Sequence, residues 1–372
     1  METIKGKYAE AKVFTDDMEA YAGAQLQMIC DNPVAEGSRI RVMPDVHPGK
    51  VGTIGLTMTV GKRVIPHLLG VDIGCGMTCA VIREKRIEMQ KLDKVIRECI
   101  PSGFQIRKRA HYMAEKFDPE KLRCHRHIQK EKAALSLGTL GGGNHFIEVD
   151  KDEDGRLCLI VHSGSRHPGK EVTDCYVNAG AELLKQKGME VPCPMTWLEG
   201  ELMEDYIADV GVMQEYAQLN REIILTEILK NMKLKETERF SCAHNYMECR
   251  AGERILRKGA ICAAKGERVI IPVNMRDGVL LGIGKGNRDW NESAPHGSGR
   301  SMRRDEVKRQ YTVSAFKNEM KGIYCSCIGP DTLDEAPFAY RPMEKLLENI
   351  RDTVEVTHIL KPVYNFKAGG KG

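Results

Sequence analysis

The sequence lacks any long apolar segment. Its 372 residues contain no apolar run of about 18 residues, the length that spans a bilayer. Residues 1–10 also lack the apolar core of a signal peptide. We therefore expect a cytoplasmic protein without a membrane partner.

The sequence also lacks internal repeats, low-complexity linkers and any shift in composition that would mark a domain boundary. Its 42% hydrophobic and 29% charged residues are typical of a globular chain that buries a large core. These features predict one continuous α+β domain over residues 1–372.

Charge of one sign is not in large excess. The chain has 56 Lys and Arg against 52 Asp and Glu, a net charge of +4, which permits a nucleic-acid partner without requiring one. Basic residues nevertheless gather in the segment 107–132, with Phe104, Tyr112 and Phe117 nearby. Such a segment either follows a phosphate backbone or forms a solvated helical face.

Cysteine is abundant but follows no disulfide framework. The 13 cysteines are irregularly spaced, which favours reduced thiols or metal ligands. Within the stretch 69–77, Asp72 and Cys75 lie three residues apart in a glycine-rich turn. A thiolate beside a carboxylate suits a transition metal better than calcium. The alternative is a tight turn that buries a small cysteine.

Three histidines stand at similar glycine-rich or strand-terminal turns, namely His145, His162 and His244. Together with Asp72 and Cys75 they offer enough donors for two adjacent divalent ions if the thiolate bridges them. Paired ions suit phosphoryl transfer because they hold both the attacking and the leaving oxygen.

His296 is different, because its turn 296–300 combines an imidazole with small residues and the cation Arg300. We predict that this turn opens a helix at 302–321, whose N-terminus would attract an anion. The combination fits a covalent nucleotidyl-histidine better than a further metal ligand.

The apolar spacing predicts the remaining elements. The predicted strands are 39–43, 51–60, 64–69, 77–82, 146–149, 157–161 and 278–284, and a further segment without an assigned type spans 356–364. The predicted helices are 16–30, 87–99, 169–187, 199–232 and 343–352. We also predict a rigid turn at 44–49, which carries Asp45, and a β-hairpin at 260–273.

The order of these motifs and their residues resemble those of the RtcB family of GTP-dependent RNA ligases. The matching segments are Pro-Asp-Val-His-Pro-Gly at 44–49, Gly-Val-Asp-Ile-Gly-Cys-Gly at 70–76, Leu-Gly-Thr-Leu-Gly-Gly-Gly-Asn-His-Phe-Ile-Glu at 137–148, His-Ser-Gly-Ser-Arg at 162–166, Ala-His-Asn at 243–245, Pro-His-Gly-Ser-Gly-Arg at 295–300, Asp-Glu-Ala-Pro-Phe-Ala-Tyr at 334–340 and the terminal Lys-Gly. They cover nearly the whole chain. The resemblance implies a single domain whose β-sheets surround a central metal and nucleotide cleft, with helices on its flanks.

The resemblance implies two Mn²⁺ ions bridged by Cys75, with ligands from Asp72, His145, His162 and His244. It also implies that GTP guanylylates His296, while Asp45 has a supporting catalytic role. The guanylyl group then passes to an RNA 3′-phosphate, formed from a 2′,3′-cyclic phosphate, and a 5′-hydroxyl attacks the activated end and releases GMP. The other residues implied to contact GTP are Asn144, His145, Phe146, Glu148, His244, Asn245, Gly297, Ser298, Gly299 and Lys371.

The chain departs from the family pattern in the loop 273–276 and at Val279, so guanine contacts differ there. We nevertheless assign Asn274 and Met275 of this loop to the nucleotide site. The chain is similar to a shorter bacterial subgroup associated with RNA repair, so its RNA need not be a tRNA splicing intermediate.

Two other functions compete with ligation. The same dinuclear site can open cyclic phosphates without joining ends, in which case neither GTP nor His296 is required. A catalytically silent RNA-binding protein would need no metal at all. The ligase hypothesis also allows a partner protein that stimulates guanylylation.

Overall fold

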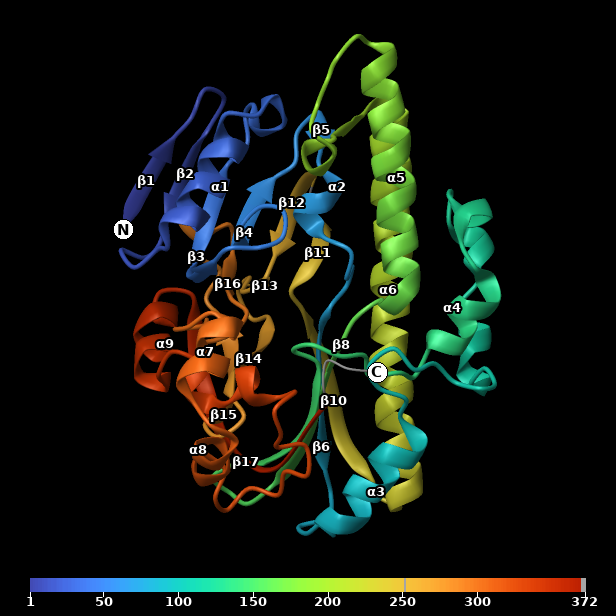
Figure 1. Ribbon diagram of the computed structural model, residues 1–372, viewed down its shortest axis with the longest axis vertical. Coiled ribbons are helices and arrows are strands. Elements are labelled where there is room, and N and C mark those ends of the chain that lie inside the picture. Colours follow the sequence, from blue (N-terminus) through green and yellow to red (C-terminus); the bar gives the residue numbers. More distant parts are fainter. Residues whose placement is uncertain (251, 369–372) are drawn as a thin grey trace.

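Two sheets, of six and seven strands, form the framework of the molecule (Figure 1). The computed structural model describes residues 1–250 and 252–368. The strands are β1 (Glu2–Lys5), β2 (Glu10–Val13), β3 (Ile40–His47), β4 (Ile54–Thr59), β5 (Arg63–Val64), β6 (Gly76–Ile82), β7 (Phe146–Lys151), β8 (Leu157–Ser163), β9 (Leu198–Glu199), β10 (Glu236–Ala243), β11 (Asn245–Arg250), β12 (Glu253–Lys258), β13 (Ala260–Cys262), β14 (Arg268–Asn274), β15 (Gly278–Gly284), β16 (Ser293–Pro295) and β17 (Val354–Lys367). The α-helices are α1 (Ala20–Cys30), α2 (Pro66–Leu69), α3 (Met89–Cys99), α4 (Lys130–Ser136), α5 (Arg166–Gln186), α6 (Gly200–Met232), α7 (Arg304–Gln310), α8 (Val313–Glu319) and α9 (Met343–Ile350).

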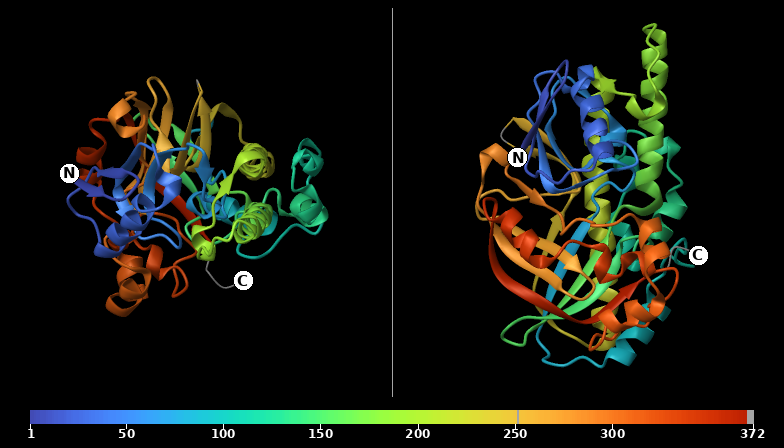
Figure 2. Two further views of the ribbon diagram at one scale, coloured as in Figure 1. Left: turned by 90° about the horizontal axis from the view of Figure 1, so that it is seen from above. Right: turned by 60° about the vertical axis from the view of Figure 1, so that its left-hand side comes forward.

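The seven-stranded sheet has the order β10-β6-β8-β7-β17-β15-β14 and is strongly curled (Figure 2). Side chains alternate between its two faces, as the pleat requires. On β8, Leu157, Leu159 and Val161 pack on the face that α3 and α6 cover. Cys158 and Ile160 join the apolar cluster on the concave face. By the same alternation His162 points into the concavity, where the candidate site lies.

The six-stranded sheet has the order β1-β2-β3-β4-β12-β11, and only its β2–β3 pair is parallel. It packs with α1, α2, α5 and part of α6 in the largest apolar cluster. The α6 helix, 33 residues long, contributes to this cluster and to the one behind the seven-stranded sheet. It therefore links the two sheets.

The predicted α+β fold class is confirmed, and most of the predicted elements are present with shifted ends. Three local predictions are wrong. The proposed turn at 44–49 is the end of β3, which continues to His47. Residues 260–273 do not form a hairpin, because β13 pairs with β16 and β14 pairs with β15. The segment 64–69 is a two-residue strand followed by α2, which begins at Pro66.

The predicted helix at 302–321 is also wrong. It is two short helices, α7 and α8, separated at Tyr311 and Thr312, both of which have extended backbone angles. The first of them begins at Arg304, well after His296. His296 instead follows β16 directly, so its turn does not open a helix.

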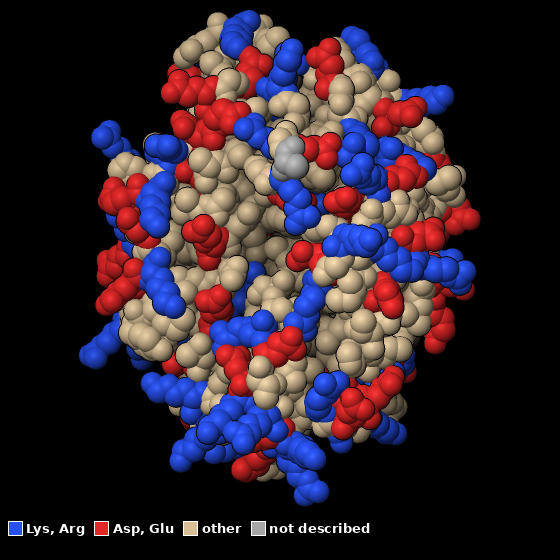
Figure 3. Space-filling model, turned by 180° about the vertical axis from the view of Figure 1, so that it is seen from behind, with Lys and Arg blue, Asp and Glu red and all other residues tan. Residues whose placement is uncertain are grey.

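The face opposite that of Figure 1 is hollowed near its middle and carries acidic and basic side chains interspersed (Figure 3). This mixture agrees with the small net charge of +4. Among the helices of residues 1–250 and 252–368, none has both the length and the apolar composition needed to cross a membrane.

Candidate metal centre and nucleotide pocket

The turn that carries Asp72 and Cys75 is fixed by close packing against α6. Gly74 has a φ of +71°, and a Cβ at this position would lie 2.8 Å from the Cβ of Ala217. Its N–H donates to the carbonyl of Asn245 at 2.6 Å. A side chain at position 74 is therefore both strained and obstructed, which explains why glycine precedes the cysteine.

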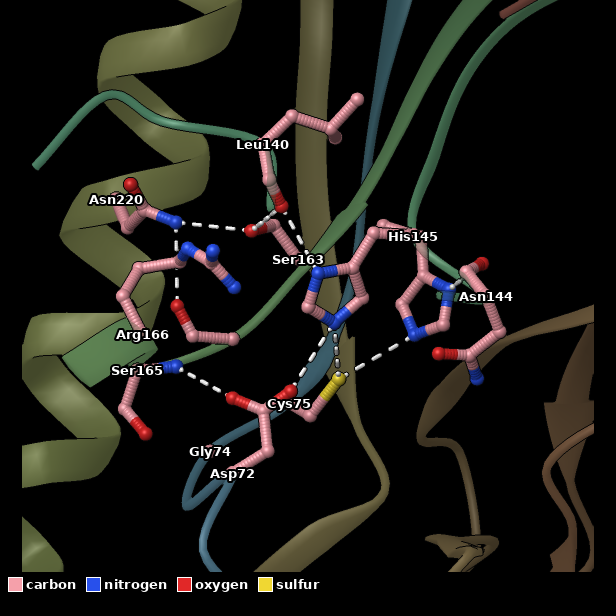
Figure 4. A network of polar contacts seen from close by, with 12 residues as sticks. Asp72, Gly74, Cys75, Leu140, Asn144, His145, Ser163, Ser165, Arg166 and Asn220 are labelled. Carbon is pink, nitrogen blue, oxygen red and sulfur yellow. Dashed lines mark hydrogen bonds and ion pairs between the residues drawn. The ribbon is translucent and has the colours of Figure 1, made fainter. Parts of the chain in front are cut away.

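Five predicted ligands come together in two overlapping groups that share Cys75. Figure 4 shows Asp72, Cys75 and His145 of the first group. One group contains Asp72, Cys75 and His145, and the other contains Cys75, His162 and His244; within each group the donor atoms lie within 4.8 Å of one another. Cys75 Sγ is 3.4 Å from His145 Nε2 and 3.3 Å from His162 Nε2. Both groups are of the donor type that transition metals prefer.

Backbone carbonyls set the protonation of two of these imidazoles. His145 Nδ1 lies 2.8 Å from the carbonyl of Leu140, and His162 Nδ1 lies 3.1 Å from that of Asn144. A carbonyl only accepts, so Nδ1 carries a proton in each ring and Nε2 is the nitrogen available to a metal. His162 Nε2 lies 3.3 Å from His244 Nε2. Nitrogen donors that converge in this way, oriented by a carbonyl behind them, are the usual arrangement around a metal.

Burial keeps His162 and His244 neutral. The pKa values of His162 and His244 are held well below the ordinary value, first by burial and then by neighbouring imidazoles. Burial and the nearby Asp72 raise the pKa of the Cys75 thiol. Burial also opposes ionisation of Asp72, but the contact with His145 prevails and lowers its pKa to about 2.

Asp72 is the one predicted ligand that solvent reaches substantially. Its side chain is 31% exposed, whereas that of His145 is 4% exposed. Its Oδ1 accepts the N–H of Ser165 at 3.0 Å, and its Oδ2 lies 3.0 Å from His145 Nε2. A Cβ on Gly164 would lie 2.1 Å from this Oδ1, so a glycine is required at position 164.

Two adjacent side chains of α6 hold the ligand-bearing loops together. Arg221, which is 2% exposed, donates to the carbonyls of Gly74 at 2.8 Å and Ser163 at 2.9 Å. The Asn220 amide accepts the N–H of Gly138 at 2.7 Å and donates to the carbonyl of Gly164 at 3.1 Å. Neither residue is recognisable from the sequence, because both lie within an ordinary helical pattern.

His296 lies beside the cluster and is oriented by Asp45. Its Nδ1 is 2.7 Å from Asp45 Oδ2, and its backbone N–H donates to the same oxygen at 3.2 Å. Its ring centroid is 5.0 Å from that of His244. If Asp45 is ionised it accepts the Nδ1 proton, which leaves Nε2 of His296 free as a nucleophile.

A cavity next to this histidine is lined by most of the residues predicted to contact the nucleotide. Of these it includes Asn144, Phe146, Glu148, His244, Asn274, Met275, His296, Gly297, Ser298 and Gly299. His145 and Asn245 do not line it, and the Asn245 amide instead accepts the N–H of Gly259 at 2.9 Å. The predicted contact Lys371 lies outside the described residues.

Basic side chains line the cavity, and the sequence alone indicates only one of them, Arg300. Arg300, Arg304 and Lys367 line it. Glu335, in the motif 334–340, contacts all three of them, and Lys367 Nζ lies 2.7 Å from its Oε2. The sequence indicates Lys371, in the terminal Lys-Gly pair, but has no local signal for Lys367.

The loop that departs from the family pattern is well ordered by its own side chains. Asn274 Nδ2 donates to Asp277 at 2.8 Å, and Asn274 Oδ1 accepts the N–H groups of Arg276 and Asp277 at 2.9 Å. Ser298 donates to the carbonyl of Val273 at 2.7 Å. The loop therefore forms one wall of the cavity. Most of the polar groups named above form hydrogen bonds that stabilise the loop conformation.

A buried cluster of metal-type donors beside a basic cavity is typical of metal-dependent enzymes of phosphoryl transfer. Comparison with known sequences is more specific. The chain belongs to the RtcB family, because the sequence model of that family, described as tRNA-splicing ligase RtcB, matches residues 25–368. The protein is therefore an RNA ligase, and the family resemblance found in the sequence is confirmed.

Similar proteins span the length of this chain. The RNA-splicing ligase RtcB of Escherichia coli strain K12 is 28% identical, with 97% of this chain and 98% of that protein aligned. The tRNA-splicing ligase RtcB of Archaeoglobus fulgidus is 27% identical, with 88% and 86% aligned. That of Aeropyrum pernix is 25% identical, with 82% and 83% aligned.

We expect Arg221→Met to destabilise the fold, because the methionine leaves the buried carbonyls of Gly74 and Ser163 without this donor. Each buried acceptor left unpaired costs about 1–3 kcal/mol. Urea unfolding measures the loss in free energy of unfolding. Arg83→Met, at an exposed position, should have little effect. Equal stability of the two variants would contradict the clamping role of Arg221.

We expect Gly164→Ala to reduce the content of bound divalent metal, since its Cβ would displace Asp72. Elemental analysis after metal loading and dialysis measures this content. Gly142→Ala is a suitable control, because a Cβ there meets only the Cα of Gly103, at 3.6 Å. Full metal content in Gly164→Ala would show that Asp72 is not required for binding.

Proposed function

We propose that this RNA ligase joins an RNA 3′-phosphate or 2′,3′-cyclic phosphate to a 5′-hydroxyl, using GTP and two Mn²⁺ ions through a guanylylated His296, in RNA repair or tRNA splicing. The observation that carries the proposal is the contact between Asp45 and His296 Nδ1, 2.7 Å long, at the boundary between the donor cluster and the basic cavity. This contact orients the His296 ring and leaves its Nε2 free, at a place where a bound metal and a nucleotide would both be close.

The donor cluster fits two transition-metal ions. Asp72 and His145 would hold one ion, His162 and His244 the other, and the Cys75 thiolate would contact both. Such ions supply positive charge that stabilises the phosphoryl groups during transfer. The Nε2 atoms of His162 and His244 lie 3.3 Å apart, which supports this assignment.

His296 is the proposed nucleophile of the first step. Its Nε2 attacks the α-phosphorus of GTP, so that a P–N bond forms and the P–O bond to the β-phosphate breaks, with pyrophosphate leaving. Asp45, which is 2% exposed, holds the Nδ1 proton and stabilises the positive charge that develops on the ring. This is the orienting role that a buried carboxylate has beside other catalytic histidines.

The basic cavity supports a nucleotide as the co-substrate. Arg300, Arg304 and Lys367 carry three positive charges around Glu335. The side chain of Lys367 also lies over the ring of Phe146, with Nζ 5.5 Å from the ring centroid. A cavity with cationic walls and an aromatic face suits a phosphate-bearing purine.

The later steps use the same centre. The guanylyl group moves from His296 to the RNA 3′-phosphate, which breaks the P–N bond and forms a phosphoanhydride. The 5′-hydroxyl oxygen then attacks the 3′-phosphorus, forming the phosphodiester while GMP leaves. His296 returns to the free imidazole, and Asp45 again orients it.

The first test is labelling of the protein with GTP that carries radioactive phosphorus at the α-position, in the presence of Mn²⁺. We expect an acid-labile adduct in the native protein, none in His296→Asn, and formation slowed on the order of 100-fold in Asp45→Asn because the ring loses its orienting carboxylate. His127→Asn, at an exposed histidine, is the matched control. An adduct that persists in His296→Asn would refute the proposed nucleophile.

A second test counts the metals. We expect two Mn²⁺ per native chain, about one in Asp72→Ala or His244→Ala, and none or nearly none in Cys75→Ala, because only Cys75 belongs to both donor groups. Cys79→Ala, at a fully buried cysteine of β6, should keep both ions. Loss of a single ion in Cys75→Ala would contradict a bridging thiolate.

A further inference from the structure

An exposed aromatic ring stands beside the metal centre without a role in the site described above. Phe104 is 81% exposed, the highest value among the described large apolar residues. It lies in a tight turn in which Gly103 has a φ of +64° and the N–H of Gln105 donates to the carbonyl of Ser102 at 3.2 Å. The turn places the Phe104 ring in solvent, where it buries little apolar surface against the protein. Packing therefore does not explain an aromatic residue at this position.

This turn is fastened to the loop that carries His145. Ser102 and Gly141 form a parallel bridge, and the N–H of Gly103 donates to the carbonyl of Gly141 at 2.9 Å. Arg107 donates to the carbonyl of Gly138 at 3.0 Å. Phe104 therefore has a defined position relative to the metal ligands although its ring is in solvent.

Arg166 links the same turn to Asp72. Its guanidinium donates to the carbonyl of Gly103 at 3.2 Å. The neighbouring Ser165 donates its N–H to Asp72 Oδ1. Val71, next to Asp72, is itself 43% exposed. The exposed side of the metal centre thus has an apolar and aromatic border.

This side is distinct from the nucleotide cavity. Asp72 does not line that cavity, whereas His162 and His244 do. Figures 1 and 2 show α7 and β14, which belong to the cavity wall, on one side of β6 and β8, and the teal segment that leads to α4 on the other. A second substrate can therefore reach the centre past Asp72 while the cavity is filled.

The nearby charges favour a polyanion. Lys108 and Arg109 follow the turn, are exposed, and form no ion pair with any residue in 1–250 or 252–368. In contrast, Arg107, Arg123 and Lys130 of the basic segment are each paired with a carboxylate. Lys116, Lys121, Arg126 and Lys132 further along the segment also have no ion pair among the described residues, so Lys108 and Arg109 are the unpaired cations nearest in sequence to the exposed ring.

We propose that Phe104 is a stacking platform for a base near the reacting end of single-stranded RNA, with Lys108 and Arg109 on its backbone phosphates. Aromatic side chains bind bases through their faces, and cationic side chains beside them follow the strand. The inference rests on the RNA ligase function and adds a binding position that requires neither GTP nor His296. It locates the strand on the Asp72 side of the centre.

The test uses Phe104→Ala, Phe104→Leu and Phe104→Trp, with Tyr21→Ala as the control because Tyr21 is another exposed aromatic residue, on α1. We expect KM for RNA to rise about tenfold in the alanine and leucine variants, with kcat at saturating RNA nearly unchanged, and to return to the native value in the tryptophan variant. Guanylylation of His296 in the absence of RNA should be equal in all of them.

A direct measurement uses RNA with 2-aminopurine beside a 3′-phosphate, or beside a 5′-hydroxyl in a second RNA. Stacking on Phe104 should quench the fluorescence of one of these RNAs in the native protein and in Phe104→Trp, but not in Phe104→Ala, which identifies the strand that stacks. This binding needs no turnover, so it tests the platform even if guanylylation fails.

Three results would overturn the proposal. Native KM and quenching in Phe104→Ala would show that the ring does not contact RNA. Reduced guanylylation in that variant would indicate a structural role instead. Unchanged RNA kinetics together with loss of a concentration-dependent dimer in Phe104→Ala would assign the ring to contact with a second copy of the chain.

Discussion

The candidate metal centre depends on hydrogen bonds that two neighbouring residues of α6, Asn220 and Arg221, form with separate loops. Arg221 joins the turn that carries Cys75 to the end of β8, and Asn220 joins the loop before His145 to Gly164. Loops rich in glycine have many conformations to lose on folding. Buried donors that satisfy their carbonyls select the one conformation in which the ligands converge. The long helix therefore matters to the chemistry as well as to the core.

The thiol of Cys75 divides the site into two sides. Toward the cavity lie His162, His244 and His296, and toward solvent lies Asp72. A reaction that joins two RNA ends with the help of a nucleotide must bring three reactants to one place. Two approaches to one centre make this possible, since a strand that passes Asp72 does not have to displace what fills the cavity. The backbone contacts between the Phe104 turn and the His145 loop fix the position of the proposed RNA-binding ring relative to the candidate metal ligands.

The five residues predicted as metal ligands do lie together in the structure, whereas the residues that position them were not predicted. Asp72, Cys75, His145, His162 and His244 stand at glycine-rich turns whose local pattern is visible in the chain, and they do converge. Asn220 and Arg221 could not be recognised, because a buried polar residue in a helix has no local signal that separates it from a solvated one. The helix proposed after His296 failed for a related reason: helical spacing at 302–321 does not reveal the extended residues Tyr311 and Thr312.

The position of Lys367 shows most clearly what tertiary structure adds to sequence. On β7, Phe146 and Glu148 point into the concave face, so their partners on β17 do the same. The pairing of β17 with β7 shifts by one residue between Pro362 and Tyr364, and this bulge places Asn365 opposite Glu148 and Lys367 opposite Phe146. Without the extra residue, Tyr364 and Phe366 would occupy these places and the amide and ammonium groups would face the apolar core behind the sheet. A single inserted residue, invisible in the alternation of the strand, thus decides which side chains reach the cavity beside His296.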